Sequence, residues 1–299
     1  MRKDRYPTRR HATSTYHDRP DPVVWSDGAP PDFISRDRID RFEREGMLVL
    51  ENLFSIEEIE RAIADLDRMR GHAESLEPGT VVREPQADAI RSIFRVHRQS
   101  NAFVNLARNA RLRALVEYIL GDRVYIMQSR INEKPAFDGA CFDWHSDFET
   151  WHAEDGMPRM RAVSVSVFLS ENSTLNGPTM FVPGSHKTFV ACPGETPQEH
   201  YKTSLRRQEF GVPGHEAIAE LAGRAGLVAP SGPAGTAVLF DCNLLHASAM
   251  NMTPWPRRNA FFVFNAVSNE LEDPFDRGEP RPDFLAERHV SADRHQPAA

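Results

Sequence analysis

The sequence predicts a mainly β protein, built as a sandwich or barrel, with helices in its N-terminal third. From about residue 123 onward, short apolar runs alternate with Gly, Pro, Asn and Ser, which is typical of many short strands joined by turns. Before that point, apolar residues recur at helical spacing. The 299 residues contain no internal repeat, and 40% apolar and 26% charged residues are typical of a globular protein, so we expect one domain.

Capping residues and glycines define the elements of the first third. Ser55 and Glu58 form a capping-box pair, and apolar side chains follow at helical spacing from Ile56 to Met69. The predicted elements are a helix begun by Ser35 and ended by Gly46, a strand over 47–51, a helix over 56–71, and two helices between about 100 and 120 ended by Gly121.

The polar ends of the chain are predicted to lie outside the domain. Residues 1–30 are rich in Arg and Pro without an apolar period, and residues 272–299 are charged and rich in Pro. We therefore expect a flexible N-terminal arm and a C-terminal tail over these ranges. The domain between them is predicted over 31–271, with a helical part over about 31–121, a β core over about 122–271, and a polar insertion in that core over about 184–232.

Charge and composition exclude several classes of protein. A net charge of −7 and a pI of about 6.0 argue against a nucleic-acid binder. No run reaches the roughly 18 apolar residues of a membrane helix, and the basic start MRKDRYPTRRHATS has no apolar stretch behind it. Three cysteines are too few for a disulfide framework, so we expect a cytoplasmic protein. We also predict a homodimer, for which the sequence itself offers no pattern.

The segment FDWHSDFETWH contains the most informative motif, His145 and Asp147 in HSD. On a strand, residues i and i+2 face the same way with Cα atoms roughly 6.5–7 Å apart, so both side chains can bind one metal ion. His246, after the strand-like GTAVLFD, is the best third ligand. Two His and one carboxylate suit a non-haem Fe(II) oxygenase. The alternative for the HxD pair alone is a set of polar residues in a surface turn.

Two downstream residues fit a 2-oxoglutarate site. Arg257 opens the strand RRNAFFVFNAV, and an arginine can pair bidentately with the C5 carboxylate of this cosubstrate. Ser248 can supply a hydroxyl to the same carboxylate. The alternative for Arg257 is an ordinary surface arginine beside Arg258.

A polar row on the strand 123–134 suggests a pocket wall. By alternation, Gln128, Arg130, Asn132 and Lys134 share one face with the apolar residues at 124 and 126. The alternative is a strand that leaves the core at Gln128 and becomes exposed to solvent. Downstream of the HSD motif, the acidic residues Glu149, Glu154 and Asp155 are most simply a solvated loop face.

These segments resemble a known family. FDWHSDFETWHAEDGMPRMRAVSVS, followed by NGPTMFVPGSHK, closely resembles the ectoine hydroxylases, a branch of the phytanoyl-CoA dioxygenase-like superfamily. The resemblance extends over roughly residues 20–275, including DPVVW near the start. The motif NGPTMFVPGSH marks only the superfamily, whereas the long ungapped run is much more specific. The resemblance implies a double-stranded β-helix, a jelly-roll (cupin-like) core.

The resemblance also implies a role for individual residues. The iron ligands, which are the catalytic residues, fall on His145, Asp147 and His246. The contacts to 2-oxoglutarate fall on Lys134, Ser248 and Arg257, with Asn132, Phe142 and Ser164 close by. The contacts to ectoine fall on Gln128 and Trp151, helped by Phe240, Asn259 and Phe261.

The reaction implied is ectoine plus 2-oxoglutarate plus O₂ giving 5-hydroxyectoine, succinate and CO₂, as part of the synthesis of a compatible solute under osmotic stress. Ectoine is a small zwitterion with a delocalised cation, so aromatic faces and polar groups are expected around it. Two alternatives stay open. One is an oxygenase for another small zwitterion or an acyl-CoA, although no basic patch for CoA phosphates is apparent. The other is a non-catalytic jelly-roll binding module.

Overall fold

Antiparallel sheets form the centre of the computed structural model, which describes residues 4–84, 88–197, 199, 201–205, 208–276 and 278–288. The largest sheet has the order β2-β10-β7-β12-β5-β4-β3, and a second has the order β6-β11-β8. A third sheet pairs β1 with β9. The strands are β1 (Thr15–Asp18), β2 (Met47–Leu50), β3 (Val81–Arg83), β4 (Ile90–Phe94), β5 (Val124–Lys134), β6 (Phe142–His145), β7 (Ala162–Phe168), β8 (Thr179–Phe181), β9 (Thr188–Ala191), β10 (Ala237–Asp241), β11 (His246–Ser248) and β12 (Arg257–Ala266).

The helices lie mostly where helical spacing predicts them. The capping box of Ser55 and Glu58 is present, and Gly46 and Gly121 end their helices in the left-handed conformation, with φ of 80° and 57°. Ser35 precedes its helix without a side-chain cap. The helices are α1 (Arg36–Glu45), α2 (Ile56–Gly71), α3 (Val96–Gln99), α4 (Asn101–Ala107), α5 (Ala110–Leu120), α6 (Asp147–Asp155), α7 (Tyr201–Ser204) and α8 (His215–Ala225), with short 3₁₀ turns at Ala73–Ser75, Ser185–Lys187 and Val267–Asn269.

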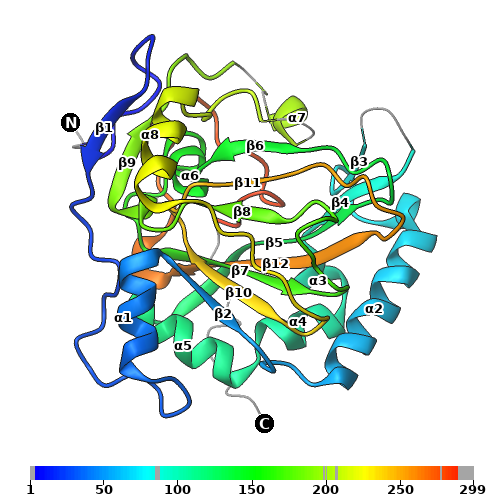
Figure 1. Ribbon diagram of the computed structural model, residues 1–299. Helices are drawn as coiled ribbons and strands as arrows, with labels where there is room; N and C mark the ends of the chain where they lie inside the picture. The colour runs from blue at the N-terminus through cyan, green and yellow to red at the C-terminus, as the bar shows by residue number, and fades with distance from the viewer. Residues whose placement is uncertain are drawn as a thin grey trace.

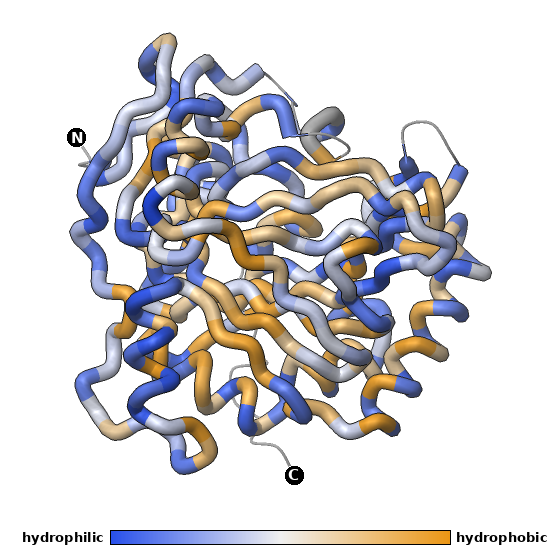
Figure 2. The backbone as a smooth tube through the Cα atoms, in the orientation of Figure 1, coloured by the Kyte–Doolittle hydropathy of each residue, from blue (hydrophilic) through white to orange (hydrophobic). Residues whose placement is uncertain are grey.

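The N-terminal helices cover one face of the large sheet. In Figure 1, α1, α2, α4 and α5 lie along its lower side, and Figure 2 shows hydrophobic segments concentrated there. Phe42, Leu66 and Leu115 from the helices join Val165 and Phe262 from the sheet in one fully buried cluster. This core leaves the other face of the large sheet free to meet the small sheet β6-β11-β8. Two facing sheets are the jelly-roll arrangement that the sequence predicts.

A β-bulge changes the predicted alternation of β5. Gln128 pairs with Val263 and the residue at 126 pairs with Phe264, so Met127 has no partner on β12. Met127 therefore faces the cavity side together with Gln128, whereas Val124 belongs to the core beneath the helices. The prediction that Val124 shares a face with Gln128 is wrong, because a bulge shifts the alternation by one residue.

Both polar ends of the chain pack against the β core. Composition predicts a flexible arm over 1–30, whereas within the described residues 4–30 Tyr6 and Arg9 are buried and β1 pairs with β9. In the predicted tail, Leu285 and Ala286 are fully buried. Composition hides this packing because the buried arginines of these segments find carboxylate partners on α6.

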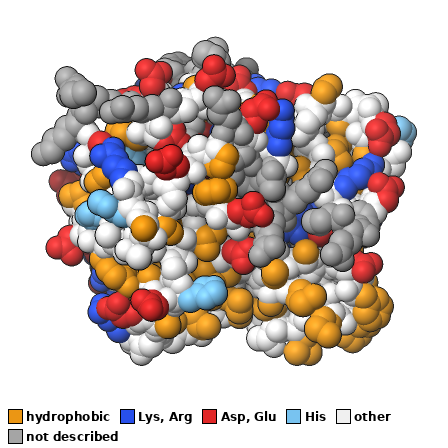
Figure 3. All heavy atoms as spheres, turned by 90° about the horizontal axis from the view of Figure 1, so that it is seen from above, with side chains coloured by type: hydrophobic (Ala, Val, Ile, Leu, Met, Phe, Trp, Pro, Cys, Tyr) orange, Lys and Arg blue, Asp and Glu red, His pale blue; other side chains and the backbone are white. Residues whose placement is uncertain are grey.

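The surface carries both signs of charge. On the face seen from above in Figure 3, acidic and basic side chains are interspersed among apolar ones. Within the described part of the chain, every helix is too short or too polar to cross a membrane.

Candidate active site

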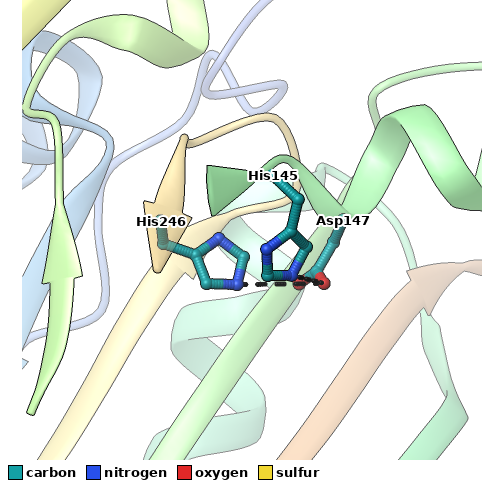
Figure 4. Close-up of side chains that lie close together, drawn as sticks. All are labelled: His145, Asp147 and His246. Atoms are coloured by element: carbon teal, nitrogen blue, oxygen red, sulfur yellow. Dashed lines mark ion pairs between the residues drawn. The ribbon is translucent and has the colours of Figure 1, made fainter. Parts of the chain in front are cut away.

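Two strands and a helix bring His145, Asp147 and His246 together. His145 ends β6 and pairs directly with His246, which begins β11, while Asp147 is the first residue of α6. Asp147 Oδ1 lies 3.7 Å from His145 Nε2 and 3.9 Å from His246 Nε2. Figure 4 shows the three side chains converging on one point. Their possible ligand atoms all lie within 4.8 Å of one another, which is close enough for one metal ion.

Backbone carbonyls fix the orientation of both imidazoles. His145 Nδ1 lies 2.8 Å from the carbonyl oxygen of Asp143, and His246 Nδ1 lies 3.0 Å from that of Leu244. A carbonyl oxygen only accepts hydrogen bonds, so each Nδ1 carries the proton and each Nε2 presents its lone pair to the centre of the triad. This is the tautomer that metal binding requires.

The carboxylate of the triad is charged and oriented. Burial alone would raise the pKa of Asp147, but His246 and His145 hold it well below its usual range. Ser164 Oγ donates to Asp147 Oδ2 at 3.0 Å. Burial, and then His145, lower the pKa of His246 to about 4, so this imidazole is neutral at physiological pH. Two imidazoles and one carboxylate on one side of a site fit a divalent iron with positions left open.

The structure brings the three predicted ligands together, but the strand geometry used to predict this is wrong. The strand ends at His145, and Ser146 is the N-cap of α6, with its hydroxyl accepting a hydrogen bond from the backbone N–H of Glu149. Asp147 therefore reaches the site from the first turn of a helix. The strand-to-helix transition brings the two side chains together as effectively as strand alternation would.

Arg257 lies fully buried in the same cavity. Its Nη2 donates to Asn132 Oδ1 at 2.6 Å and its Nη1 to Thr179 Oγ1 at 3.1 Å, while Nε has no hydrogen-bond partner. Burial, and then the nearby charges of Arg91 and Arg130, lower its pKa to about 9. Among the described residues this guanidinium forms no ion pair, so its environment favours an incoming anion.

Not all the predicted cosubstrate residues line this cavity. Asn132, Phe142, Ser248 and Arg257 do. Ser164 instead orients Asp147, and Lys134 is buried beside the cavity with its ammonium on the carbonyl oxygen of Ala140. Burial, and then Arg257 and Arg91, lower the pKa of Lys134 to about 6.

Three of the predicted substrate residues line the cavity: Gln128, Trp151 and Phe261. Trp151 lies one helical turn beyond Asp147 on α6 and is 3% exposed. Gln128 Nε2 already donates to the carbonyl oxygen of Leu285 at 2.6 Å, a contact from the C-terminal segment that the sequence does not predict.

The two other predicted substrate residues lie behind the cavity wall. Phe240 packs edge-on against the imidazole of His246 with ring centroids 5.1 Å apart. Asn259 is fully buried and donates to Ser166 Oγ at 3.2 Å. Within the described residues, neither lines the cavity; Phe240 packs against His246, which does, whereas Asn259 bonds to Ser166, which does not.

Arg130 is the main cavity residue for which the sequence predicts no role of its own. Its guanidinium lies 5.1 Å from the centre of the Phe261 ring, and it makes no hydrogen bond or ion pair with any described residue. The alternation of β5 had already put it on the same face as Asn132, which is the pattern that could have found it. Other unpredicted cavity residues are Arg91, Thr150, Thr179, Gln208, Arg281 and Leu285.

The acidic residues on α6 are buried, and the prediction of a solvated loop face is wrong. Arg9 from the N-terminal segment lies 2.9 Å from Glu149 and 2.6 Å from Glu154. Arg281 from the C-terminal segment lies 2.5 Å from Asp155. Charge alone suggested solvent exposure, but both partners lie more than 120 residues away in the sequence, where no local pattern reveals them.

The chain is similar to ectoine dioxygenases over nearly its full length. The family model for phytanoyl-CoA dioxygenase (PhyH) matches residues 42–259. An ectoine dioxygenase from Sphingopyxis alaskensis is 52% identical over 289 residues, which cover 96% of this chain and 94% of that protein. An ectoine dioxygenase from Stutzerimonas stutzeri is 46% identical, with 96% of this chain and 95% of that protein covered.

A solved structure confirms the predicted fold. The crystal structure of EctD from S. alaskensis with 2-oxoglutarate and 5-hydroxyectoine matches with a TM-score of 0.87 and 48% identity, covering 97% of this chain and 96% of that chain. A crystal structure of the same protein with bound Fe matches with a TM-score of 0.86 over the same shares of both chains. The chain therefore belongs to the phytanoyl-CoA dioxygenase family and, within it, to the ectoine dioxygenases.

Proposed function

We propose that this chain hydroxylates ectoine to 5-hydroxyectoine, using Fe(II), 2-oxoglutarate and O₂ and releasing succinate and CO₂. One observation carries the proposal: a metal-binding triad and a buried arginine without an ion pair among the described residues line the same cavity. The choice of ectoine as the substrate rests on the similarity to ectoine dioxygenases, which are 46–52% identical over nearly the whole chain. Bound Fe(II) supplies the activation of O₂ that couples decarboxylation of 2-oxoglutarate to hydroxylation of a C–H bond.

The chain's own residues hold the metal and the cosubstrate. His145, Asp147 and His246 bind Fe(II), with the proton fixed on Nδ1 of each histidine. Arg257 pairs with the C5 carboxylate of 2-oxoglutarate, and its bond to Asn132 holds the guanidinium plane in place. Because Arg257 is fully buried, the ion pair is stronger than it would be in water.

The other end of the cavity suits a small zwitterion. The aromatic faces of Trp151 and Phe261 can stack against the delocalised cation of ectoine. Arg130 provides a buried positive charge for the substrate carboxylate, and Gln128 adds a polar contact. These residues hold the ring beside the metal triad and keep water away from it.

Three finer statements belong to the same proposal. We propose that the enzyme works in the cytoplasm, that it forms a homodimer, and that it serves compatible-solute synthesis under osmotic stress. Residues 31–271 are proposed to form its single domain. Light scattering of the purified protein tests the dimer, and the hydroxyectoine content of salt-stressed cells that lack the protein tests the role.

The reaction is tested with purified protein loaded anaerobically with Fe(II). We expect O₂-dependent formation of succinate and 5-hydroxyectoine in equal amounts when ectoine and 2-oxoglutarate are both present. Omission of ectoine measures background decarboxylation. Succinate formation that ectoine does not stimulate would contradict the proposal, and replacing ectoine by a panel of other small zwitterions would then identify the substrate class.

A further inference from the structure

The loop 249–256 joins two residues that line the cavity. Ser248 is the last residue of β11, and Arg257 is the first residue of β12. Met252 in this loop is 72% exposed, whereas the neighbouring Asn251 is fully buried. Burial of an amide is costly unless it is hydrogen-bonded, so the partners of this side chain show what it holds in place.

The Asn251 side chain joins the loop to the end of β5. Its Nδ2 lies 3.3 Å from the carbonyl oxygen of Lys134, 3.0 Å from that of Pro135 and 2.8 Å from that of Trp255. An amide nitrogen has two N–H groups, so the three carbonyls share them. Its Oδ1 accepts hydrogen bonds from the backbone N–H of Thr253 at 3.0 Å and from the Thr253 hydroxyl at 2.8 Å. The polar atoms of this buried side chain are therefore all bonded, and they link β5 to the segment that leads into β12.

Two glycines let neighbouring segments close around the same side chain. The backbone N–H of Asn251 donates to the carbonyl oxygen of Gly139 at 2.8 Å. A Cβ at Gly139 would lie 3.0 Å from Asn251 Cβ and 2.8 Å from Lys134 Cβ, and one at Gly177 would lie 2.7 Å from Lys134 Cδ. Both positions therefore require glycine. The stem of Lys134 is enclosed by these segments, and its ammonium bonds to the carbonyl oxygen of Ala140.

The bonds of Asn251 lie next to two cations that repel each other. Lys134 is the last residue of β5 and Arg257 the first residue of β12, and they are paired directly across the two strands. Both are buried, and like charges directly opposite each other destabilise an antiparallel pair. The pairing of β5 with β12 ends at this position. The bonds that Asn251 makes immediately beyond it hold the two strand ends together.

We propose that Asn251 is the positioning residue that holds Lys134 and Arg257 together for the C5 carboxylate of 2-oxoglutarate. This inference rests on the proposed function, because that function assigns the C5 carboxylate to Arg257. Asn251 is not among the described residues that line the cavity, so it acts through the two cations and not by contact with the cosubstrate. A site whose cations are already in place binds a dianion without the cost of first bringing like charges together.

Asn251→Ala removes the bonds to β5 and is tested by calorimetric binding to the anaerobic Fe(II) protein without ectoine. Loss of a group that orients a ligand typically costs 10–100-fold, so we expect the Kd for 2-oxoglutarate to rise about 10-fold. Oxalate can chelate the iron but has no distal carboxylate for Arg257, so its Kd should stay at the wild-type value. The iron content and the KM for ectoine should also stay unchanged.

Two control variants separate positioning from general folding. Asn269→Ala removes an equally buried amide beyond the other end of β12, where it donates to the carbonyl oxygen of Arg159 at 3.0 Å. It should lower the melting temperature as Asn251→Ala does, but keep the wild-type Kd for 2-oxoglutarate. Thr253→Val removes a hydroxyl within the loop and leaves the bonds from Asn251 to β5, so it should also keep the wild-type Kd.

Equal losses of affinity for 2-oxoglutarate and oxalate in Asn251→Ala would overturn the proposal, as would an unchanged Kd for 2-oxoglutarate. Asn251→Ser keeps one donor for the three carbonyls, so we expect a smaller rise in the same Kd. If Asn251→Ala does not fold, the two Kd values of Asn251→Ser decide the question. A wild-type protein that binds 2-oxoglutarate but does not hydroxylate ectoine would refute the proposed substrate and leave the comparison of the Asn251 variants valid.

Discussion

The two ends of the cavity are held in place in different ways. At the metal end, His145, His246 and Arg257 lie on strands of two facing sheets, and His145 pairs directly with His246. The substrate end also has residues on strands, but Trp151 lies on α6 and Leu285 in the C-terminal segment 278–288. Strand pairing fixes the first set, whereas Trp151 and Leu285 depend on segments that ion pairs hold to distant parts of the chain.

This difference predicts how each end of the cavity responds to a mutation. Strand pairing distributes the positioning of the two histidines over many backbone hydrogen bonds, so a single side-chain change there removes a function without moving its neighbours. At the substrate end, α6 is anchored by Arg9 and Arg281, one from each terminal segment. Loss of one anchor is therefore expected to shift several contacts at once.

The largest expected effect is the loss of the metal. Asp147→Ala removes the only carboxylate of the triad. Changes to groups that merely orient a ligand typically cost 10–100-fold, so loss of the ligand itself should lower kcat/KM by more than about 100-fold and leave the protein nearly iron-free. Iron content by atomic absorption and turnover of ectoine measure both effects.

The circular dichroism spectrum and melting temperature of Asp147→Ala should stay close to those of wild type, because sheet pairing holds the metal end. Asp138→Ala, in the exposed turn before β6, is the control and keeps full iron. Full iron content and turnover in Asp147→Ala would refute the ligand assignment.

The next effect concerns the cosubstrate. Arg257→Ala leaves the carboxylate of 2-oxoglutarate half-paired in a buried site, which costs roughly 2–5 kcal/mol, or about a 30-fold or larger rise in its KM. The KM for ectoine should change little, since Arg257 lies at the other end of the cavity. Steady-state kinetics with each substrate varied in turn measures the split.

Arg258→Ala is the matched control for Arg257→Ala. Arg258 is the next residue on β12, but its side chain is directed at Glu133, 3.6 Å away on the opposite face of the sheet. We expect it to leave both KM values near wild type. If Arg257→Ala raises the KM values for both substrates equally, the change has a general folding effect, and the assignment of Arg257 to 2-oxoglutarate is contradicted.

The metal end was also the part that sequence could predict. The HSD motif, His246 and Arg257 were identified from residue type and strand-like surroundings, and the structure brings all of them into one cavity. Residue type alone points to these three side chains although Asp147 starts a helix, because the residue types that bind a metal are few. At the metal end, residue types and their strand-like surroundings are sufficient to predict which side chains meet.

The substrate end could not be predicted in the same way. Gln128 contacts Leu285, and Arg281 contacts Asp155, across 157 and 126 residues respectively. Alternation and composition describe only neighbours in sequence, so they reveal none of these partners and predict a solvated acidic cluster. The bulge at Met127 is not predictable from alternation either, because it arises from the pairing of β5 with β12, which lies far away in the sequence.

A third prediction tests the substrate end. Trp151→Ala removes an aromatic face from a desolvated cation, an interaction worth up to about 2 kcal/mol, and should raise the KM for ectoine by roughly 30-fold. Iron content and the KM for 2-oxoglutarate should be almost unchanged. Because the ring is then held poorly beside the metal, 2-oxoglutarate is consumed without hydroxylation and succinate exceeds hydroxyectoine.

The ratio of the two products at saturating 2-oxoglutarate is the decisive measurement for Trp151→Ala. Trp255→Ala, which changes an exposed tryptophan, is the control and keeps the ratio near one. If Trp151→Ala also keeps a ratio near one with an unchanged KM for ectoine, Trp151 serves core packing alone.

The smallest expected effect is a proton taken up at the metal end. Lys134, with its pKa lowered to about 6 by burial and by Arg257 and Arg91, is mostly neutral in the free enzyme at pH 7.5. A bound dicarboxylate beside this cluster favours the ammonium and raises the pKa, so binding of 2-oxoglutarate takes up protons, with one per site as the upper limit. Affinity should therefore weaken as pH rises above about 6, by no more than 10-fold per pH unit.

Calorimetric titration in buffers of different ionisation enthalpy measures that uptake directly. Lys134→Met keeps the apolar stem and removes the titrating group, so the uptake should disappear and the affinity should lose most of its pH dependence. Lys187→Met, which changes an exposed lysine, leaves the uptake intact. Undiminished uptake in Lys134→Met would contradict the assignment to Lys134. Another group at the metal end would then take up the proton, and the charge of the bound dicarboxylate would act on groups other than Arg257 and Lys134.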